Sequence, residues 1–399
     1  MNTKSQEKLI VDVLASLTNP DQGGKSRKIL VEINRSADWS FYVRKMAEEG
    51  VAFLFYYYLV KRRLADLVPK EMNRVLAYLY FENLRRNRTA SKALNRLFTY
   101  LNARKIPFIV MKGLALAELF YPGLATRGMS DADVLVKKED VYKVDQSLTE
   151  LGYTASDSFV EEALLNPAGY LASLDYRKKK EPFPNIHIHW HPVNTSVPAY
   201  MFSENIDLER LWQMAIQVRL ADADVRIFCP EHQLIYLCEH GLRINHSFDR
   251  LILIYDIFYV INTTDYPIDW NVVVQEVRRF KLEKFFFISL AVVKHYTPAA
   301  VSEEIMTGLR TALSLNVFDR GFLHFHLHDH RLRGSSFLLY FALNEGAFAK
   351  AGFLFRTLFP PRHILLQRSY AKGAKFNVSW YFRRIREVFS HACFVLRRL

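Results

Sequence analysis

The chain has 399 residues, half of them are hydrophobic, and its formal net charge is +13. This length and hydrophobic content allow two or three packed domains or one large unit, and they exclude a disordered chain. Three cysteines without paired spacing exclude a disulfide framework, and every apolar run is shorter than the ~20 residues that a membrane-spanning helix needs.

The polar start MNTKSQEK shows no signal-peptide pattern, so we expect a cytoplasmic protein without a transmembrane segment. The hydrophobic pattern then divides the chain into three regions. Residues 1–85 place apolar side chains at every third or fourth position, which predicts helices. Residues 86–215 mix helical and strand patterns, and residues 216–399 return to helices from Pro230 onward. The predicted fold class is α+β, with helical regions on both sides of the core.

The core begins after a long predicted helix, residues 75–103. The following elements are predicted in chain order: a short β-branched strand in KIPFIVM, a helix at 114–120, a strand at 131–136, a helix at 139–150, a short strand after Gly152-Tyr153, and the strand NIHIHW at 185–190. Residues 157–184 contain both helix-like and loop-like stretches. The order of the strands is therefore left open.

Two acids begin the strand at 131–136. Side chains alternate between the two faces of a strand, so Asp131 and Asp133 project to the same side and share one site. Two such close negative charges need a neutralising cation, and oxygen ligands suit Mg²⁺ held together with substrate phosphates. The other interpretation of a lone D-x-D is an exposed strand start.

Lys112 and Gly113 lie where the first core strand gives way to a helix. This position combines a cationic side chain with a glycine that allows close approach of a ligand, which suits a triphosphate. Arg127, in the loop before the acids, could pair with a phosphate, with the carboxylates, or in an internal salt bridge.

These motifs resemble a known family. The segments MKG, RGMSDADVLV, LGY and IHIHW, followed by CPEHQLIYLCEHGLR, RLILIYDIFYVI, IDWNVVVQEV and LFPPRHILL, look like the little-characterised bacterial nucleotidyltransferase-like proteins of the DNA polymerase β superfamily. The resemblance covers roughly residues 40 to 390. Lys112-Gly113 stands where the superfamily usually has Gly-Ser.

The resemblance implies a small mixed β-sheet on which Asp131 and Asp133 hold Mg²⁺ or Mn²⁺ and the phosphates of a nucleoside triphosphate. An acceptor hydroxyl, on a small molecule such as a sugar or polysaccharide precursor or on a protein, would attack the α-phosphorus and release pyrophosphate. The implied nucleotide-binding residues are Lys112, Gly113, Arg127, Ser130 and His240.

A third carboxylate normally completes this site, and His187 stands at its expected position in NIHIHW. Three interpretations remain open. His187 replaces the carboxylate as a neutral ligand or base, it marks a nucleotide-binding protein without turnover, or the third acid is another residue such as Asp175 or Glu181. A zinc site built from the alternating histidines of this strand would need further ligands.

Other histidines invite similar hypotheses. The run HFHLHDHR contains His324, His326, His328 and His330 in surroundings that are typical of a helix, where the four side chains diverge. His240 with Arg243, and Asp256 on the next predicted helix, could contact the nucleotide or acceptor. The alternative is a buried His–Asp hydrogen bond between helices.

The C-terminal stretch from Lys350 carries eleven Lys and Arg against one Glu, interleaved with aromatic residues. Either its aromatic side chains pack inward below a solvated basic face, or it contacts phosphates, nucleic acid or an anionic membrane surface. No RNA-recognition motif is found, so we do not expect a nucleic-acid partner. Two function classes follow: an Mg²⁺-dependent nucleotidyltransferase, or a catalytically inactive nucleotide- or partner-binding protein on the same fold.

Overall fold

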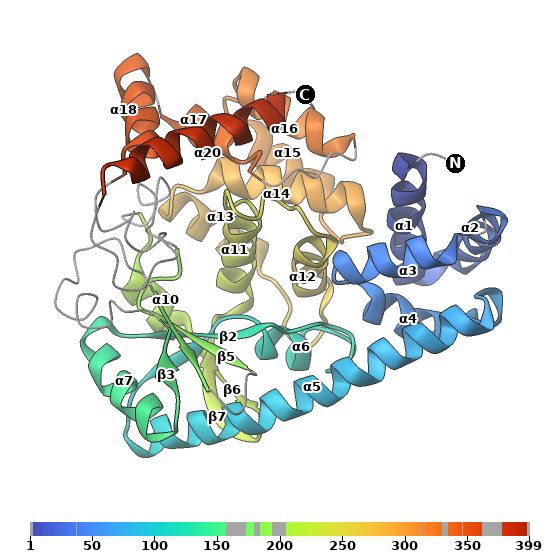
Figure 1. The fold of residues 1–399 in the computed structure, drawn as a ribbon, viewed down its shortest axis with the longest axis horizontal. Helices are drawn as coiled ribbons and strands as arrows, with labels where there is room; N and C mark the ends of the chain where they lie inside the picture. The colour runs from blue at the N-terminus through green and yellow to red at the C-terminus, as the bar shows by residue number, and fades with distance from the viewer. Residues whose placement is uncertain are drawn as a thin grey trace.

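A computed structural model shows an α+β fold with helices around one mixed sheet (Figure 1). The structure describes residues 3–36, 38–156, 173–178, 184–193, 205–311, 313–328, 334–344, 346–360 and 377–396. In Figure 1 the N-terminal helices lie to one side of the molecule, the sheet lies at the bottom, and the C-terminal helices lie above the sheet.

The N-terminal region is helical, as its apolar spacing predicts. It consists of α1 (Thr3–Thr18), η1 (Pro20–Gln22), α2 (Gly23–Ser36), α3 (Trp39–Glu48), α4 (Ala52–Lys61) and η2 (Ala65–Leu67). These helices pack on one another and on the long helix α5 (Lys70–Ala103), which runs beneath the sheet in Figure 1. The inner face of α5 is buried at every third or fourth residue, for example at Leu76, Asn83, Asn87, Ala90 and Leu94.

The strands of the described residues form one seven-stranded sheet in the order β3-β4-β5-β2-β1-β7-β6. Their bounds are β1 (Phe108–Val110), β2 (Asp131–Val136), β3 (Thr154–Ala155), β4 (Ser173–Arg177), β5 (Asn185–His189), β6 (Ile216–Leu220) and β7 (Ala223–Ile227). The central strand β2 pairs antiparallel with β1 and parallel with β5, and β1 pairs parallel with β7. The outer pairs β3–β4, β4–β5 and β6–β7 are antiparallel, so the sheet is mixed.

The central strands are also the most buried ones. All of β1 is buried, and β2 is buried from its second residue onward, because helices cover both faces of the sheet there. Strand β7 alternates buried and exposed residues, as expected nearer an edge. Helices α6 (Leu114–Leu119), α7 (Val141–Glu150) and α10 (Leu208–Met214), with the 3₁₀ turn η3 (Lys138–Asp140), connect the strands.

The chain is helical again from Pro230. The described helices are α11 (Pro230–Gly241), α12 (Leu251–Asn262), α13 (Trp270–Arg279), α14 (Glu283–Tyr296), α15 (Glu303–Thr311), α16 (Val317–Leu327), α17 (Phe337–Leu343), α18 (Gly346–Leu358) and α20 (Ser379–Leu396). Helix α11 packs against α12, α13 and α14 and is almost entirely buried.

Two parts of the sheet were not predicted. Strand β4 lies inside the ambiguous segment 157–184, of which residues 157–172 and 179–183 lie outside the described residues. The β6–β7 hairpin turns at Ala221 and Asp222, whose φ angles are +51° and +59°. A turn with two positive φ values normally carries Asn-Gly or Asp-Gly, and this pair gives no such signal. Helix α5 crosses the predicted boundary at residue 85, and strands β6 and β7 of the same sheet lie beyond the predicted boundary at residue 215. The division of the chain into three regions remains a prediction.

The first half of the histidine run belongs to a helix, as expected. His324 and His326 lie in α16, and the buried His326 ring places Nε2 3.1 Å from the carbonyl oxygen of Ser247. His328 follows the end of α16, and His330 lies outside the described residues. His326 is therefore part of the packing between α16 and the loop before α12.

The basic C-terminal stretch is only partly packed inward. Phe353 is 1 % exposed, whereas Phe355 and Phe382 are 62 % and 71 % exposed. The alternative in which its aromatic side chains pack inward holds for Phe353 and is wrong for Phe355 of α18 and Phe382 of α20. Residues 361–376, which contain several of its cations, lie outside the described residues.

Candidate active site

The strand register brings the predicted acids and His187 together. His187 of β5 lies opposite Asp133 of β2 on one side and opposite Asp175 of β4 on the other. Directly opposed residues of neighbouring strands point to the same face, so these three side chains form a row across the sheet. Asp131 lies two residues before Asp133 and therefore on the same face.

The His187 ring lies among three carboxylates. Its Nδ1 is 3.6 Å from Asp131 Oδ2 and 3.7 Å from Asp133 Oδ1, and its Nε2 is 3.2 Å from Asp175 Oδ1. Asp175 was one of the two residues considered as the third acid. The other, Glu181, lies outside the described residues.

Asp133 is the buried centre of the cluster, with 2 % of its surface exposed. Lys112 Nζ lies 3.0 Å from its Oδ2, and His189 Nε2 lies 3.0 Å from its Oδ1. Burial by itself would raise the pKa of Asp133, but Lys112, His187 and His189 hold it well below its usual range. Asp133 is therefore ionised and held in place before any ligand arrives.

The two histidines of β5 differ in protonation. Burial opposes the charged form of both, yet the bond with Asp133 and the nearby carboxylates raise the pKa of His187 to about 8. For His189 burial dominates, and the charges of His187 and Lys112 add to it, so its pKa is lowered. At neutral pH, His187 is thus a cation among the acids and His189 is a neutral partner of Asp133.

Lys112 and Gly113 meet the cluster from the end of β1. Gly113 has a φ of +67°, and a Cβ atom there would lie 2.9 Å from the carbonyl oxygen of Asp131. Only glycine fits both requirements without strain. The glycine thus allows the chain to turn against β2 with Lys112 directed at Asp133. At the mouth of the site, the exposed Ser130 donates from Oγ to Asp131 Oδ1 at 3.1 Å.

Arg127 forms the internal salt bridge that was one of its three expected roles. Its Nε and Nη2 donate to the two oxygens of Asp256 on α12 at 2.7 and 2.8 Å, and Tyr121 donates to the same carboxylate at 2.8 Å. The carbonyl oxygen of Arg127 accepts from Asn83 and Asn87 of α5. Arg127 therefore joins α12 and α5 to the loop before β2. These bonds hold the loop that leads into the acidic strand in place.

Helix α11 supplies the other expected residue, His240, and one that sequence reasoning missed, Tyr236. The anticipated His240–Asp256 hydrogen bond is not made, because Arg127 and Tyr121 hold the carboxylate of Asp256. The charges of Lys112 and Asp133 both act on the pKa of His240 and on that of Tyr236, which places α11 beside the cluster. The signal for Tyr236 was its spacing, four residues before His240 on one face of a helix.

The arrangement of donors suits a divalent cation. Among the described residues, Asp133, His187 and His189 form one group whose ligand atoms all lie within 4.8 Å of one another, and Asp131 lies beside them. Carboxylate oxygens favour Mg²⁺ and Mn²⁺, and imidazole nitrogens favour Mn²⁺ and softer ions. Asp133, His187 and His189 could therefore hold a metal ion when His187 is neutral, because a protonated imidazole has no free nitrogen to donate.

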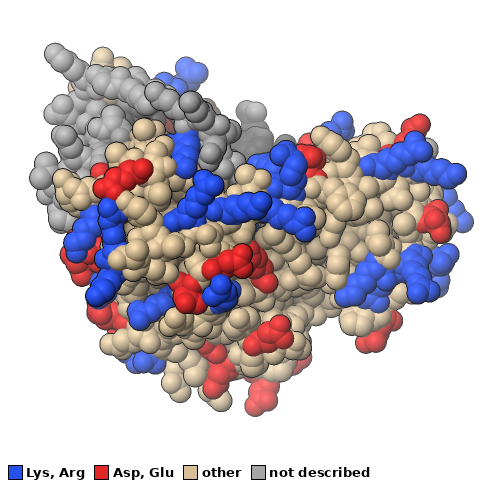
Figure 2. Space-filling model, turned by 90° about the horizontal axis from the view of Figure 1, so that it is seen from below, with Lys and Arg blue, Asp and Glu red and all other residues tan. Residues whose placement is uncertain are grey.

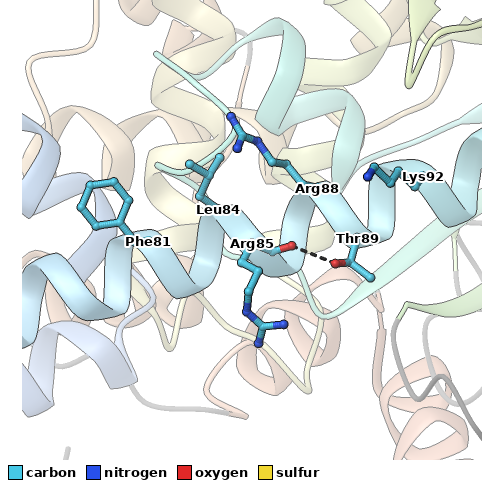
Figure 3. Close-up of a pocket in the computed structure, with 6 residues that line it drawn as sticks. All are labelled: Phe81, Leu84, Arg85, Arg88, Thr89 and Lys92. Atoms are coloured by element: carbon cyan, nitrogen blue, oxygen red, sulfur yellow. Dashed lines mark hydrogen bonds between the residues drawn. The ribbon is translucent and has the colours of Figure 1, made fainter.

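A hollow of about 380 Å³ on the outer face of α5 is a different kind of site (Figure 3). Its lining consists of Phe81, Leu84, Arg85, Arg88, Thr89 and Lys92, with no acid or histidine. Figure 3 shows Arg85 and Arg88 projecting to different sides of the helix. Figure 2 views the molecule from below, the side on which α5 lies in Figure 1, and shows groups of Lys and Arg side chains with acids between some of them. This hollow offers cations for an anion but no group for metal or acid–base chemistry.

The comparisons with known proteins identify one family. The model of a family described as an uncharacterised nucleotidyltransferase matches residues 35–298, about two thirds of the chain. The chain belongs to this uncharacterised nucleotidyltransferase family. The matched region contains the whole acid–histidine–lysine cluster and α11. No curated protein and no solved structure matches the chain.

None of the described helices combines the length and the apolar character required to cross a membrane.

Proposed function

We propose that this protein transfers a nucleoside monophosphate from a nucleoside triphosphate to a hydroxyl group, with Mg²⁺ or Mn²⁺ at Asp131 and Asp133. The observation that carries the proposal is the strand pair itself. Two carboxylates of β2 share one face with His187, and Lys112 lies 3.0 Å from the buried carboxylate. A pair of acids beside a fixed cation is the arrangement that phosphoryl-type transfer needs.

The reaction forms one bond and breaks one. The acceptor oxygen bonds to the α-phosphorus, the bond from the α-phosphorus to its bridging oxygen breaks, and pyrophosphate leaves with the bonding electrons. A metal ion held by Asp131 and Asp133 would neutralise the phosphates and lower the pKa of the acceptor hydroxyl. Lys112 supplies a further positive charge, and the acceptor's proton passes to one of the solvent-accessible carboxylates, Asp131 or Asp175, because His187 already carries a proton.

The first experiment compares pyrophosphate release by the wild type and by Asp131→Asn, with each of the four nucleoside triphosphates, Mg²⁺ or Mn²⁺, and a panel of sugar and protein acceptors. Asp131→Asn keeps the shape of a partly exposed side chain but removes its charge. We expect release to fall by roughly 10²-fold or more, as for loss of one electrostatic contact to a transition state.

The matched control is Asp224→Asn on the outer hairpin. Its carboxylate is 66 % exposed and lies 3.8 Å from Arg219. This variant should release pyrophosphate as the wild type does. Equal release by wild type and Asp131→Asn would refute the assignment of the metal site.

A nucleotide-binding protein without turnover is the second candidate, and the position of His187 favours it. Both ring nitrogens of His187 already face carboxylates, and its raised pKa makes it a cation where the third acid is expected. Calorimetric titration of each nucleotide separates the two candidates. Binding that needs Asp131 and Mg²⁺, without pyrophosphate from any acceptor, would support the second; pyrophosphate would support the first.

A further inference from the structure

Helix α11 carries three buried polar side chains on one face. Gln233, Tyr236 and His240 are spaced three and four residues apart, which places them on one side of a helix. Their exposed fractions are 0 %, 6 % and 7 %. Among the described residues, no hydrogen-bond partner is found for either amide atom of Gln233, for the Tyr236 hydroxyl or for Nδ1 of His240.

Such groups are unusual in a protein interior. A buried polar atom without a partner loses its bonds to water and gains nothing in return, so most buried polar atoms are hydrogen-bonded. Elsewhere in this chain the buried Tyr121 and Tyr296 follow that rule: their hydroxyls donate to Asp256 and to the carbonyl oxygen of His326 at 2.8 and 2.9 Å. Single unpaired atoms occur elsewhere in the described residues, for example Oδ1 of Asn87. Three such side chains gathered on one face indicate a bound molecule, either water or a ligand.

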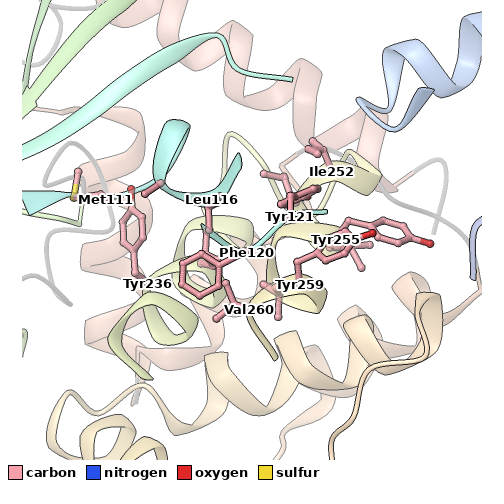
Figure 4. Packing of buried hydrophobic residues seen from close by; sticks show 14 of the residues in the cluster. Met111, Leu116, Phe120, Tyr121, Tyr236, Ile252, Tyr255, Tyr259 and Val260 are labelled. Atoms are coloured by element: carbon pink, nitrogen blue, oxygen red, sulfur yellow. The ribbon is translucent and has the colours of Figure 1, made fainter. Parts of the chain in front are cut away.

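This face of α11 borders the cluster formed by Lys112 and Asp133. Burial lowers the pKa of Lys112, and two neighbours oppose this effect most strongly: first Asp133 and then Tyr236. Figure 4 shows the ring of Tyr236 with its hydroxyl directed toward Met111, the residue before Lys112. Lys112, Arg243 and His246 surround His240 with positive charge, and Asp133 adds one negative charge. Arg243 itself is paired with Glu239 at 2.7 Å.

We infer that the Tyr236 hydroxyl and His240 Nδ1 bind phosphate oxygens of the nucleoside triphosphate next to Lys112. This assignment rests on the proposed function and adds a specific contact set to it. A phenol and an imidazole N–H are hydrogen-bond donors, and phosphate oxygens are acceptors that also favour a nearby ammonium group. Bound phosphate would satisfy both atoms at once and would explain why α11 keeps them in the interior.

The test measures ligand affinity and thermal stability of the full-length chain with Tyr236→Phe. Inorganic tripolyphosphate and the four nucleoside triphosphates are titrated in the presence of Mg²⁺. We expect the dissociation constant for tripolyphosphate to rise about tenfold, which equals about 1.4 kcal/mol at 25 °C. We also expect an unchanged or higher Tm, because the substitution removes a buried hydroxyl that has no partner to lose.

Tyr296→Phe is the matched control. Its hydroxyl is equally buried but donates to the carbonyl oxygen of His326 on α16. This variant should have a lower Tm and wild-type affinity for tripolyphosphate. The opposite responses of two Tyr→Phe changes separate a ligand-binding hydroxyl from a structural one.

The outcomes distinguish this inference from the function on which it rests. Equal affinity of the wild type and Tyr236→Phe, or no binding of tripolyphosphate to the wild type, overturns the role of Tyr236. Weakened tripolyphosphate binding by Tyr236→Phe, with no binding of any nucleoside triphosphate, supports the phosphate contact and counts against nucleotidyl transfer.

Discussion

Lys112 Nζ lies 3.0 Å from Asp133 Oδ2, and only 14 % and 3 % of the two side chains are exposed. This ion pair joins the second residue after β1 to the middle of β2. It places a positive charge beside the acids before any ligand binds, and each member depends on the other for neutralisation.

Lys112→Met should therefore destabilise the fold by about 3–5 kcal/mol, because it leaves the buried carboxylate without its cation. The double variant Lys112→Met/Asp133→Asn should recover part of that loss, since both charges are then gone. Urea unfolding of the two single variants and the double variant measures the coupling. Additive losses would show that the pair contributes nothing beyond its separate members.

Arg127→Met should destabilise the protein by a similar amount, about 3–5 kcal/mol, because Asp256 is left buried and charged. Nucleotide affinity of the folded variant should change little, since the guanidinium donates to Asp256 and not to Asp131 or Asp133. Arg85→Met is the matched control: its partner Glu82 lies on the exposed face of α5, and its Tm should equal that of the wild type. A large loss of affinity with little loss of stability would instead make Arg127 a phosphate ligand.

Gly113→Ala should cost about 1–3 kcal/mol of folding stability, because its φ of +67° strains any other residue. The added Cβ would also press on the carbonyl oxygen of Asp131 at 2.9 Å and displace the strand start. Metal affinity, measured by Mn²⁺ titration, should fall with it. Gly24→Ala, where nothing lies within 4 Å of the added carbon, should leave metal affinity unchanged.

Stability should fall as the pH drops below about 6.5, the pKa of an unfolded histidine. Burial and the charges of Lys112, Arg243 and His246 hold the pKa of His240 well below that value. Between these two pKa values the unfolded chain binds a proton at this position that the folded chain does not, so folding loses up to ~1.4 kcal/mol per pH unit. Thermal denaturation from pH 7.5 to 5 should show a smaller decline for His240→Asn. An equal decline would place the proton uptake at other groups.

Much of the core was predictable from local patterns. The strand at 131–136 and the helices on either side of it have the expected bounds to within a few residues, because their hydrophobic periods are regular. The β6–β7 hairpin escaped prediction, since its turn contains no glycine and places Ala221, a residue that rarely adopts a positive φ, at its first position.

The candidate site was likewise predictable only in part. Alternation along one strand was enough to place Asp131 and Asp133 on one face, and a glycine beside a lysine indicated a close approach to them. The partners of these residues lie on other elements: Asp175 and His187 are brought to Asp133 by strand register, and Asp256 is brought to Arg127 by helix packing.

Residues close together in the chain were sufficient to predict the α+β class, the two acids with their lysine and glycine, and the resemblance to nucleotidyltransferases. Three relations became visible only in the folded chain: His187 lies among three carboxylates, Arg127 forms an internal salt bridge, and Tyr236 borders Lys112. Those relations depend on contacts between residues far apart in sequence, which spacing along one element does not specify.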